Sequence, residues 1–210
     1  MYVPSVFSET DIGKIECFVD DHPLATVVLV ADGQAHVDHI PFMRTSGLTT
    51  GGELVAHVAK ANTIWKLIDQ NPSAVLIFAG ASAYVSPSFY PSKAITHEVV
   101  PTWNYVSIHL KGRLRLSHDN DDKRRAVDYL TRKMEVTRSA PWAIDDAPSD
   151  YIEKMLAGIV SLSFQIELIE AKFKASQNKN QEDRQGVVDS LESNSLTSEA
   201  AAVVKRYLDR

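Results

Sequence analysis

The sequence predicts an α+β protein in which a closed antiparallel β-barrel carries attached helices. Three observations lead to this fold class. About six stretches have the apolar alternation or the short apolar run of a strand, few helical stretches lie between them, and most connections are hairpins or loops. At 210 residues, the chain can bury one sizeable core with room for a helical appendage, but hardly two independent domains.

Composition narrows the classes of function. A net charge of −5 gives no overall basic field, so nonspecific nucleic-acid binding is not favoured. Cys17 is the single cysteine, which excludes an intramolecular disulfide and a cysteine-based zinc cluster and agrees with a reducing compartment. No apolar run reaches about 18 residues, so we expect no membrane span. The first residues lack a basic region followed by an apolar core, so we expect no secretory signal and a cytoplasmic protein.

The first elements are a helix and a hairpin. Ser8 can cap a helix with Asp11 as its capping-box partner, and apolar residues at helical spacing then face inward. Two β-rich runs follow, joined by Asp32-Gly33, a strong hairpin signal because both residues tolerate positive φ. The second run ends at Ile40-Pro41, where proline removes a ladder donor, so pairing stops there or the strand lies at an edge.

Residues 53–72 change from the period of a strand to that of a helix. Apolar alternation around Ala56 predicts a strand, and Asn62 then reads as the N-cap of a short helix that stops at Asn71-Pro72. Backbone N–H groups at this helix start, with Lys60 beside them, could receive a phosphate. The alternative for Lys60 is a solvated surface charge.

The stretch from Ala83 to Tyr105 follows a fully apolar strand at residues 74–78 and joins aromatic side chains to prolines. Each proline fixes φ and extends its predecessor, so we expect no helix in this stretch. Rings and prolines lose little rotamer entropy on ordering, which suits a rigid wall against a flat ligand or a partner subunit. The alternative is an ordered loop that covers its own core.

The rest of the chain supplies two further strands and a helical periphery. We expect strands at 106–116, with a bulge at Gly112, and at 160–168, and amphipathic helices at 121–136, 149–159, 186–193 and 198–208. Two basic faces could meet phosphate, although a solvated face is the more frequent explanation. They comprise Lys111, Arg113 and Arg115 on the strand, and Lys123, Arg124, Arg125, Arg132 and Lys133 on the helix.

Several kinds of site find no support in the sequence. His36 and His39 point to opposite faces of a strand, and no HExxH motif exists, so we expect no metal. There is no GxSxG elbow, no GxGxxG or GxxxxGK[ST] loop, and no pair of helices close enough for a helix-turn-helix. No catalytic acid or base can be named.

Motifs along most of the chain resemble the PaiB-like FMN-binding negative transcriptional regulators, which have the FMN-binding split-barrel fold. They are MYVPSVFSETD at the start, HIPF, HVAKAN, YVSPSFYPSK, VPTWNY, PWAIDDAPSDYIEKML and KASQN, in the order of that family. HVAKAN normally continues with proline, and here Thr63 follows. The resemblance implies a six-stranded antiparallel split barrel with peripheral helices over residues 1–186, followed by a C-terminal helical tail over 187–210.

The resemblance also implies a homodimer that binds FMN at the subunit interface. Residues at the end of the first hairpin would meet the isoalloxazine edge, those around Lys60 would hold the phosphate, and the Tyr84 to Tyr105 wall would come from the other subunit. The implied FMN contacts are His39, Pro41, Phe42, Met43, His57, Lys60, Ala61, Asn62, Tyr84, Trp103, Asn104, Lys174, Ser176, Gln177 and Asn178.

Two functions remain open at this point. The family name implies a flavin-binding repressor of genes for protease synthesis and sporulation, for which DNA is a partner that the sequence does not make evident. Other split-barrel proteins are FMN-dependent oxidoreductases acting on small molecules, and a few handle haem. Because the cofactor itself carries the hydride, the lack of an obvious catalytic side chain does not argue against an enzyme.

Overall fold

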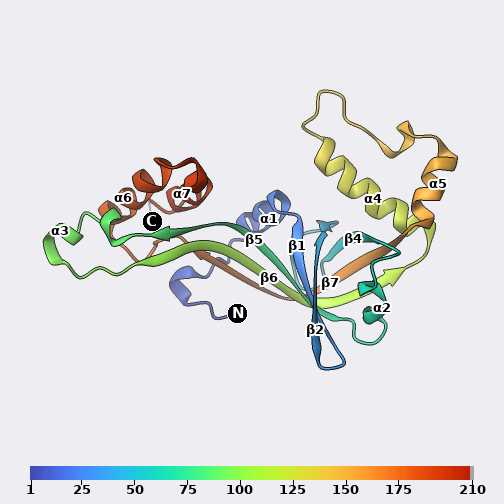
Figure 1. The fold of residues 1–210 in the computed structure, drawn as a ribbon, viewed down its shortest axis with the longest axis horizontal. Helices are drawn as coiled ribbons and strands as arrows, with labels where there is room; N and C mark the ends of the chain where they lie inside the picture. The colour runs from blue at the N-terminus through green and yellow to red at the C-terminus, as the bar shows by residue number, and fades with distance from the viewer. Residues whose placement is uncertain (209–210) are drawn as a thin grey trace. The chain divides into compact units, whose positions relative to one another are not determined.

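The computed structural model describes residues 1–208 and has the predicted α+β architecture (Figure 1). Its strands form one antiparallel sheet of seven strands in the order β2-β1-β5-β6-β7-β4-β3. The strands are β1 (Leu24–Ala31), β2 (Gln34–Pro41), β3 (Met43–Arg44), β4 (Glu53–Ala59), β5 (Ser73–Val85), β6 (Thr102–Ser117) and β7 (Ile159–Lys174). The α-helices are α1 (Ile12–Asp21), α2 (Ile64–Ile68), α3 (Lys93–Thr96), α4 (Asn120–Glu135), α5 (Ser149–Ala157), α6 (Gln181–Glu192) and α7 (Ser198–Lys205).

The order of the strands shows that the sheet curls on itself. Strands β2 and β3 stand at opposite ends of the sheet, yet only Phe42 separates them in the chain. The two edges must therefore meet at Phe42, as in a barrel. The sequence predicts about six strands, and the seventh is β3, whose two residues are too short for apolar alternation to reveal.

The β1–β2 hairpin confirms the prediction made from Asp32-Gly33. Ala31 pairs with Gln34, so the turn contains only these two residues. Their φ values are 51° and 73°, both in the left-handed region that a type I′ turn requires.

The chain divides into two compact units, and each is described by itself. The first contains Met1–Asp11, Ala79–Ile108 and the described residues from Glu170 onward, and the second contains Ile12–Phe78 and His109–Ile169. We call them the terminal unit and the central unit.

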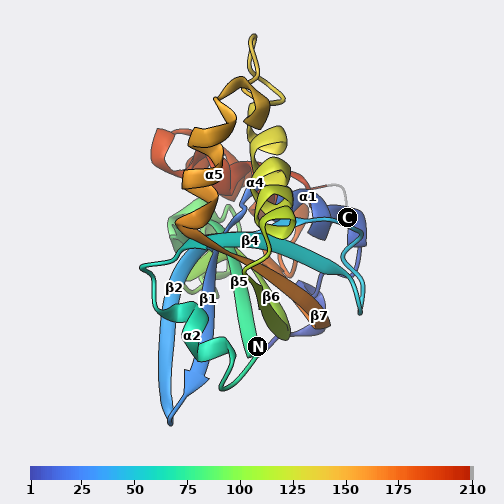
Figure 2. The ribbon, with the colours of Figure 1, turned by 90° about the vertical axis from the view of Figure 1, so that its right-hand side faces the viewer.

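Helices of the central unit bury apolar stripes. Helix α1 buries Ile15 and Phe18, and α5 buries Ile152 and Leu156 against Ile144. Figure 2 shows α4 and α5 side by side. In α4 the N-cap is Asp119, whose carboxylate accepts from the backbone N–H of residues 121 and 122.

Two local predictions were wrong. Ser8 does not cap α1, which begins at Ile12, because the backbone of Ser8 forms a bridge with Lys172. The stretch from Ala83 to Tyr105 contains the one-turn helix α3, since proline at position 91 precedes that turn and removes none of its hydrogen bonds.

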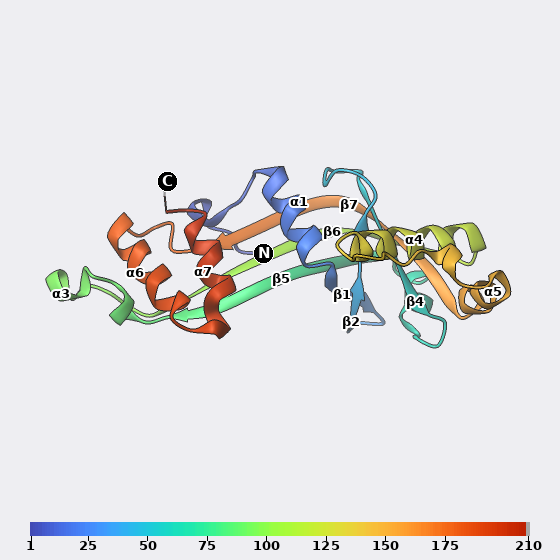
Figure 3. The same ribbon diagram turned by 90° about the horizontal axis from the view of Figure 1, so that it is seen from above.

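The terminal unit contains α6 and α7, which lie side by side in Figure 3. Val187, Val188 and Leu191 of α6 and Ala201 and Val204 of α7 are buried. The hydroxyl of Tyr207 donates to Glu9 Oε2 at 2.7 Å, which ties the C-terminal helices to the N-terminal segment. The proposed boundary between residues 186 and 187 stays a prediction.

Candidate functional site

The implied flavin contacts separate into two sets, one in each unit. The central unit holds His39, Pro41, Phe42, Met43, His57, Lys60, Ala61 and Asn62, and the terminal unit holds Tyr84, Trp103, Asn104, Lys174, Ser176, Gln177 and Asn178. Each set is built from residues that strand ends and turns bring together.

The corner between β2 and β3 is fixed by a buried anchor. Phe42 is fully buried, its ring packs edge-on against Phe164 at 6.4 Å between centroids, and its backbone N–H donates to Pro23 O at 2.8 Å. Pro41 ends β2, as the missing donor predicts, and Met43 begins β3. The backbone of this corner is therefore held in one conformation.

The turn after β4 combines a helix cap with an exposed cation. Asn62 Oδ1 accepts from the backbone N–H of Ile64 at 3.0 Å, so Asn62 caps the turn that leads into α2. The N-cap position itself is Thr63, one residue later than predicted. Its Nδ2 donates to Asp38 Oδ2 on β2. Lys60 is exposed beside this cap, and no carboxylate within residues 1–208 pairs with it. Lys60 thus offers an unneutralised positive charge.

His57 lines an apolar cavity of about 320 Å³. Its neighbours include Trp142, Tyr151 and Met155. Burial lowers the pKa of His57, because desolvation disfavours the charged imidazolium. At neutral pH the imidazole is therefore uncharged and offers a phosphate a hydrogen bond rather than a charge.

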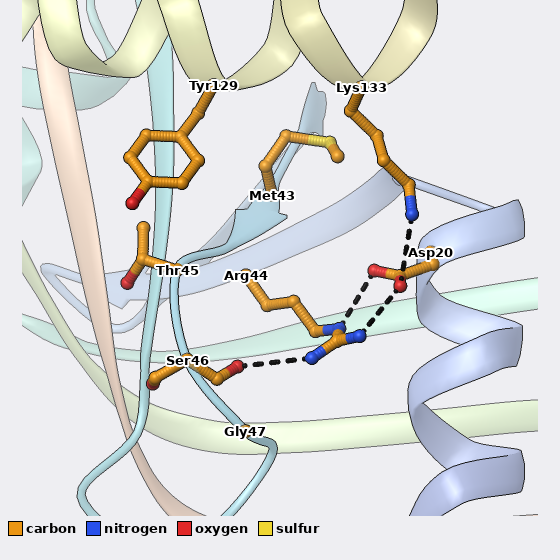
Figure 4. Close-up of a pocket in the computed structure, with 8 residues that line it drawn as sticks. All are labelled: Asp20, Met43, Arg44, Thr45, Ser46, Gly47, Tyr129 and Lys133. Carbon is orange, nitrogen blue, oxygen red and sulfur yellow. Dashed lines mark hydrogen bonds and ion pairs between the residues drawn. The ribbon is translucent and has the colours of Figure 1, made fainter. Parts of the chain in front are cut away.

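Met43 also borders a polar cavity of about 340 Å³, lined in part by Asp20, Arg44, Tyr129 and Lys133 (Figure 4). Arg44 donates to both carboxylate oxygens of Asp20, from Nε and from a terminal nitrogen, at 2.9 Å each, and Lys133 Nζ lies 3.2 Å from the same carboxylate. Although burial raises the pKa of Asp20, these hydrogen bonds outweigh it and hold the pKa below its usual value. The sequence did not predict this site, because Asp20 and Arg44 are 24 residues apart and no local pattern links them.

Tyr84 and Trp103 form an exposed aromatic pair in the terminal unit. Their ring centroids are 6.1 Å apart at an interplanar angle of 69°, an edge-to-face arrangement. The two residues are 49% and 54% exposed, so each ring leaves about half of its surface uncovered. The two rings therefore contact each other and leave surface uncovered, and the predicted role of the wall toward a ligand or partner stays a prediction.

Asn104, Lys174, Ser176 and Asn178 line a cavity of about 220 Å³ in the same unit. Asn104 Nδ2 donates to Ser176 Oγ at 2.9 Å, and Lys174 Nζ donates to Trp103 O at 2.7 Å and to the hydroxyl of Thr102. Ser176 has a φ of 62°, a left-handed conformation that is uncommon for a residue other than glycine.

Gln177 braces the turn after β7. Its side-chain amide donates to Phe173 O and accepts from the backbone N–H of Ala175. These bonds occupy the amide, so its role toward a flavin stays a prediction.

The basic face of α4, one of the two that could meet phosphate, is largely neutralised by nearby carboxylates. Arg124 pairs with Asp145, Arg125 pairs with Asp122 and Arg132 pairs with Asp128, while Lys133 pairs with Asp20. Paired charges release fewer counterions from a phosphate backbone than free ones, so this face is a poor nonspecific contact for DNA.

Two further classes of site are not seen in the described part of the chain. No helix between residues 1 and 208 is both long enough and apolar enough to cross a membrane. Within the same residues, no group of three or more His, Cys, Asp or Glu side chains could hold a metal ion.

The donors of the central unit fit a flavin mononucleotide. An unpaired lysine beside a capped turn suits its phosphate, and a rigid strand corner presents backbone groups of the kind that bind the polar edge of an isoalloxazine.

The chain is similar in sequence to two known proteins and in fold to a third. The chain is 29% identical over 195 residues to the protease synthase and sporulation protein PAI 2 of Bacillus subtilis (strain 168), covering 91% of this chain and 89% of that protein. It is 30% identical over 237 residues to an uncharacterized protein of Aspergillus fumigatus (strain Af293), covering 91% of each. Its fold is similar to that of the FAD and heme binding protein from Mycobacterium smegmatis, with a TM-score of 0.59 and 24% identity over 80% of this chain and 73% of that one.

A family described as "Putative FMN-binding domain" matches residues 1–168. This match spans well over half of the chain and includes the strand corner and the Lys60 turn. The chain therefore belongs to this FMN-binding family.

Proposed function

We propose that the protein is a homodimeric FMN-binding regulator of the PaiB type, in which each flavin lies at the subunit interface. The carrying observation is the Tyr84–Trp103 pair, whose rings stack edge-to-face and still leave about half of each surface uncovered. Exposed adjacent aromatics are typical of a surface that a partner or a ligand covers. In the dimer, this pair covers a flavin held by the other subunit.

The central unit holds the cofactor in this proposal. Lys60 supplies charge to the phosphate, Ala61 and the Asn62 cap order the turn beside it, and the neutral His57 contributes at most a hydrogen bond. The corner from Pro41 to Met43 presents backbone groups to the edge of the ring, and the exposed His39 lies on the strand leading to it. When bound, FMN supplies hydride and electron transfer, while the chain binds it, orients it and excludes water.

The remaining residues of the terminal unit close the site from the partner subunit. These residues have polar side chains and lie close to Trp103 in the sequence, or line or adjoin the neighbouring cavity. They are Asn104, Lys174, Ser176, Gln177 and Asn178. A cytoplasmic location accompanies this proposal, since the single cysteine suits a reducing compartment.

A flavin-dependent oxidoreductase acting on a small molecule is the second candidate. The pairing of Arg124, Arg125 and Arg132 with carboxylates favours it, because the helix with the most basic residues lacks free positive charge for DNA. For the same reason, we propose that if the protein regulates transcription, it does so without DNA binding by α4.

Flavin titration tests the proposed site. Lys60→Ala should weaken FMN at least about tenfold, the equivalent of about 1.4 kcal/mol for one charge-assisted contact, and should leave riboflavin nearly unchanged. Lys66→Ala is the matched control, because Lys66 is an exposed lysine on α2 that lies over the Trp65 ring. Equal losses for FMN and riboflavin would remove Lys60 from the phosphate site, and no flavin binding by the wild type would overturn the proposal.

Three further measurements separate the two candidate functions. Light scattering after gel filtration should give the mass of a dimer. Trp103→Ala should weaken FMN binding or dimerisation. A wild-type monomer with flavin bound would overturn the proposal that the flavin lies at the subunit interface. NAD(P)H turnover above the rate of free FMN supports the oxidoreductase. A salt-dependent gel shift on upstream DNA that Arg124→Ala/Arg125→Ala abolishes would support direct regulation and contradict the inference drawn from the ion pairs.

A further inference from the structure

The cavity of the terminal unit described above has the features of a binding site for a small group. Tyr90, Asn104, Lys174 and Ser176 line it, and its volume is about 220 Å³. Sites for drug-sized ligands occupy about 300–1,000 Å³, so this cavity suits a group of a few heavy atoms rather than an isoalloxazine ring.

The hydroxyl of Tyr90 is buried without a partner. Tyr90 is 2% exposed, and its Oη makes no hydrogen bond of acceptable geometry within residues 1–208. Ser176 lies close enough to influence it, yet the Ser176 hydroxyl is engaged with Asn104 at 2.9 Å. Such an unsatisfied buried group is rare in folded proteins and indicates a missing acceptor.

The missing partner must accept a hydrogen bond. Burial, with help from the Asp183 carboxylate, raises the pKa of Tyr90, so its hydroxyl stays protonated at neutral pH. Asp183 itself is already satisfied, since it accepts from the N–H and the hydroxyl of Ser92 at 3.0 and 2.8 Å. A ligand oxygen in the cavity would be the acceptor.

Two lysines without carboxylate partners, Lys174 and Lys179, line the same cavity, and Lys172 acts electrostatically on Lys174 without lining it. Lys174 Nζ donates only to neutral oxygens and lies 5.9 Å from the Phe7 ring centroid, while Lys179 Nζ lies 4.8 Å from the Tyr90 ring centroid. Lys172 is 8% exposed, and its ammonium donates to Tyr2 O at 3.2 Å. Within the described residues none of the three forms an ion pair with a carboxylate, so positive charge is in excess here, although the Asp183 carboxylate acts on Tyr90.

We propose that this cavity binds a small oxyanion, the carboxylate or phosphate group of a ligand. Lys174 supplies the charge, and Tyr90 and Asn104 donate hydrogen bonds to the oxygens. The group could belong to a free small molecule or to the phosphate of a flavin. The two sources share one chemistry, and the site does not depend on the role proposed for Lys60.

Calorimetry and thermal unfolding of the full chain with inorganic phosphate and with acetate test the proposal. We expect the wild type to bind at least one of these anions and to gain thermal stability from it. Tyr90→Phe and Lys174→Met should each weaken that binding at least about tenfold, the loss of one charge-assisted hydrogen bond. Lys93→Ala, which removes an exposed lysine of the same unit that does not line the cavity, should leave binding unchanged.

The unliganded Tyr90→Phe variant separates a binding role from a structural one. Because the hydroxyl has no partner, its removal should leave the Tm unchanged or raise it. A variant that lowers the Tm and binds the anion as the wild type does would overturn the proposal. Absence of binding by the wild type to both anions would overturn it too.

Titration with FMN and riboflavin identifies the source of the oxyanion. If FMN competes with phosphate and Lys174→Met weakens FMN but not riboflavin, the cavity takes the flavin phosphate. If FMN and phosphate bind together, it takes a separate small molecule. Either result supports the oxyanion site. If Lys60→Ala leaves FMN binding unchanged, both results can still be obtained, so the two proposals are tested separately.

Discussion

Replacing Asp20 by Asn tests whether the ion pair behind β3 holds the β2–β3 corner. Asp20 accepts hydrogen bonds from Arg44 at 2.9 Å through both oxygens and faces Lys133 at 3.2 Å (Figure 4). Arg44 is one of the two residues of β3 and follows Met43 directly. Asp20→Asn keeps the shape of the side chain and removes its charge. Lys133 then loses this counterion, and Arg44 keeps the more distant Glu16 carboxylate at 3.6 Å.

The size of the effect follows from partial burial. Hydrogen bonds to charged groups contribute about 1.5–3 kcal/mol, whereas fully exposed ion pairs contribute about 0–1 kcal/mol. The side chains of Asp20 and Arg44 are 15% and 28% exposed, which places the pair between these cases. We therefore expect Asp20→Asn to lower the free energy of unfolding by about 2 kcal/mol at neutral pH.

Urea unfolding measures this change, and pH gives an independent check. Because the folded state holds the pKa of Asp20 below its usual value, its stabilisation is complete above about pH 4 and is lost as the pH falls through the folded pKa. The difference between the wild type and Asp20→Asn should therefore shrink in acid. The matched control is Asp128→Asn, which breaks an exposed helical pair with Arg132 and should cost about 0.5 kcal/mol or less.

A loss no larger than that of Asp128→Asn, or a difference that persists unchanged at low pH, would refute this reasoning. A double-mutant cycle with Arg44→Gln would then show whether the two side chains are coupled at all.

Two further predictions concern the central unit. His57→Gln should reduce the stability that the protein loses between about pH 7 and pH 5. Burial lowers the pKa of His57, so its contribution to the free energy of unfolding is complete above the unfolded pKa and is lost as the pH falls toward the folded pKa. The urea midpoint measured as a function of pH tests this, and an unchanged pH slope would contradict it. Gly112→Ala should lower the free energy of unfolding by about 3 kcal/mol or more, because an added Cβ would lie 2.0 Å from Gln165 O. Gly158→Ala is the control, since its added Cβ would meet no atom nearer than 3.4 Å, and it should change the Tm little. Equal Tm values for the two variants would contradict the close approach at Gly112.

Much of the local structure could be predicted from the sequence. Asp32-Gly33 predicted a two-residue turn because only certain residues adopt two successive positive φ values cheaply. Asn62 predicted the start of α2 to within one residue, because its side chain reaches a backbone N–H two residues ahead. Pro41 predicted the end of β2 because it has no N–H to donate. Each signal acts within a few residues.

The candidate site was predicted in part. The Tyr84–Trp103 contact and the grouping of Asn104 with Ser176 lie within sets that the motifs had singled out. Tyr90 lies within one of these motifs but was not among the implied FMN contacts, because a sequence does not reveal which buried hydroxyl lacks a partner.

The sequence by itself determined the fold class, the hairpin, the capped turn and the family, since these depend on backbone preferences and on motifs read along the chain. Only the tertiary structure decided that Asp20 pairs with Arg44, that partial burial lowers the pKa of His57, and that no carboxylate of residues 1–208 lines the Lys174 cavity. The physical reason is range. Dihedral preferences act between neighbours in sequence, whereas charge pairing and desolvation depend on distances through space that folding alone sets.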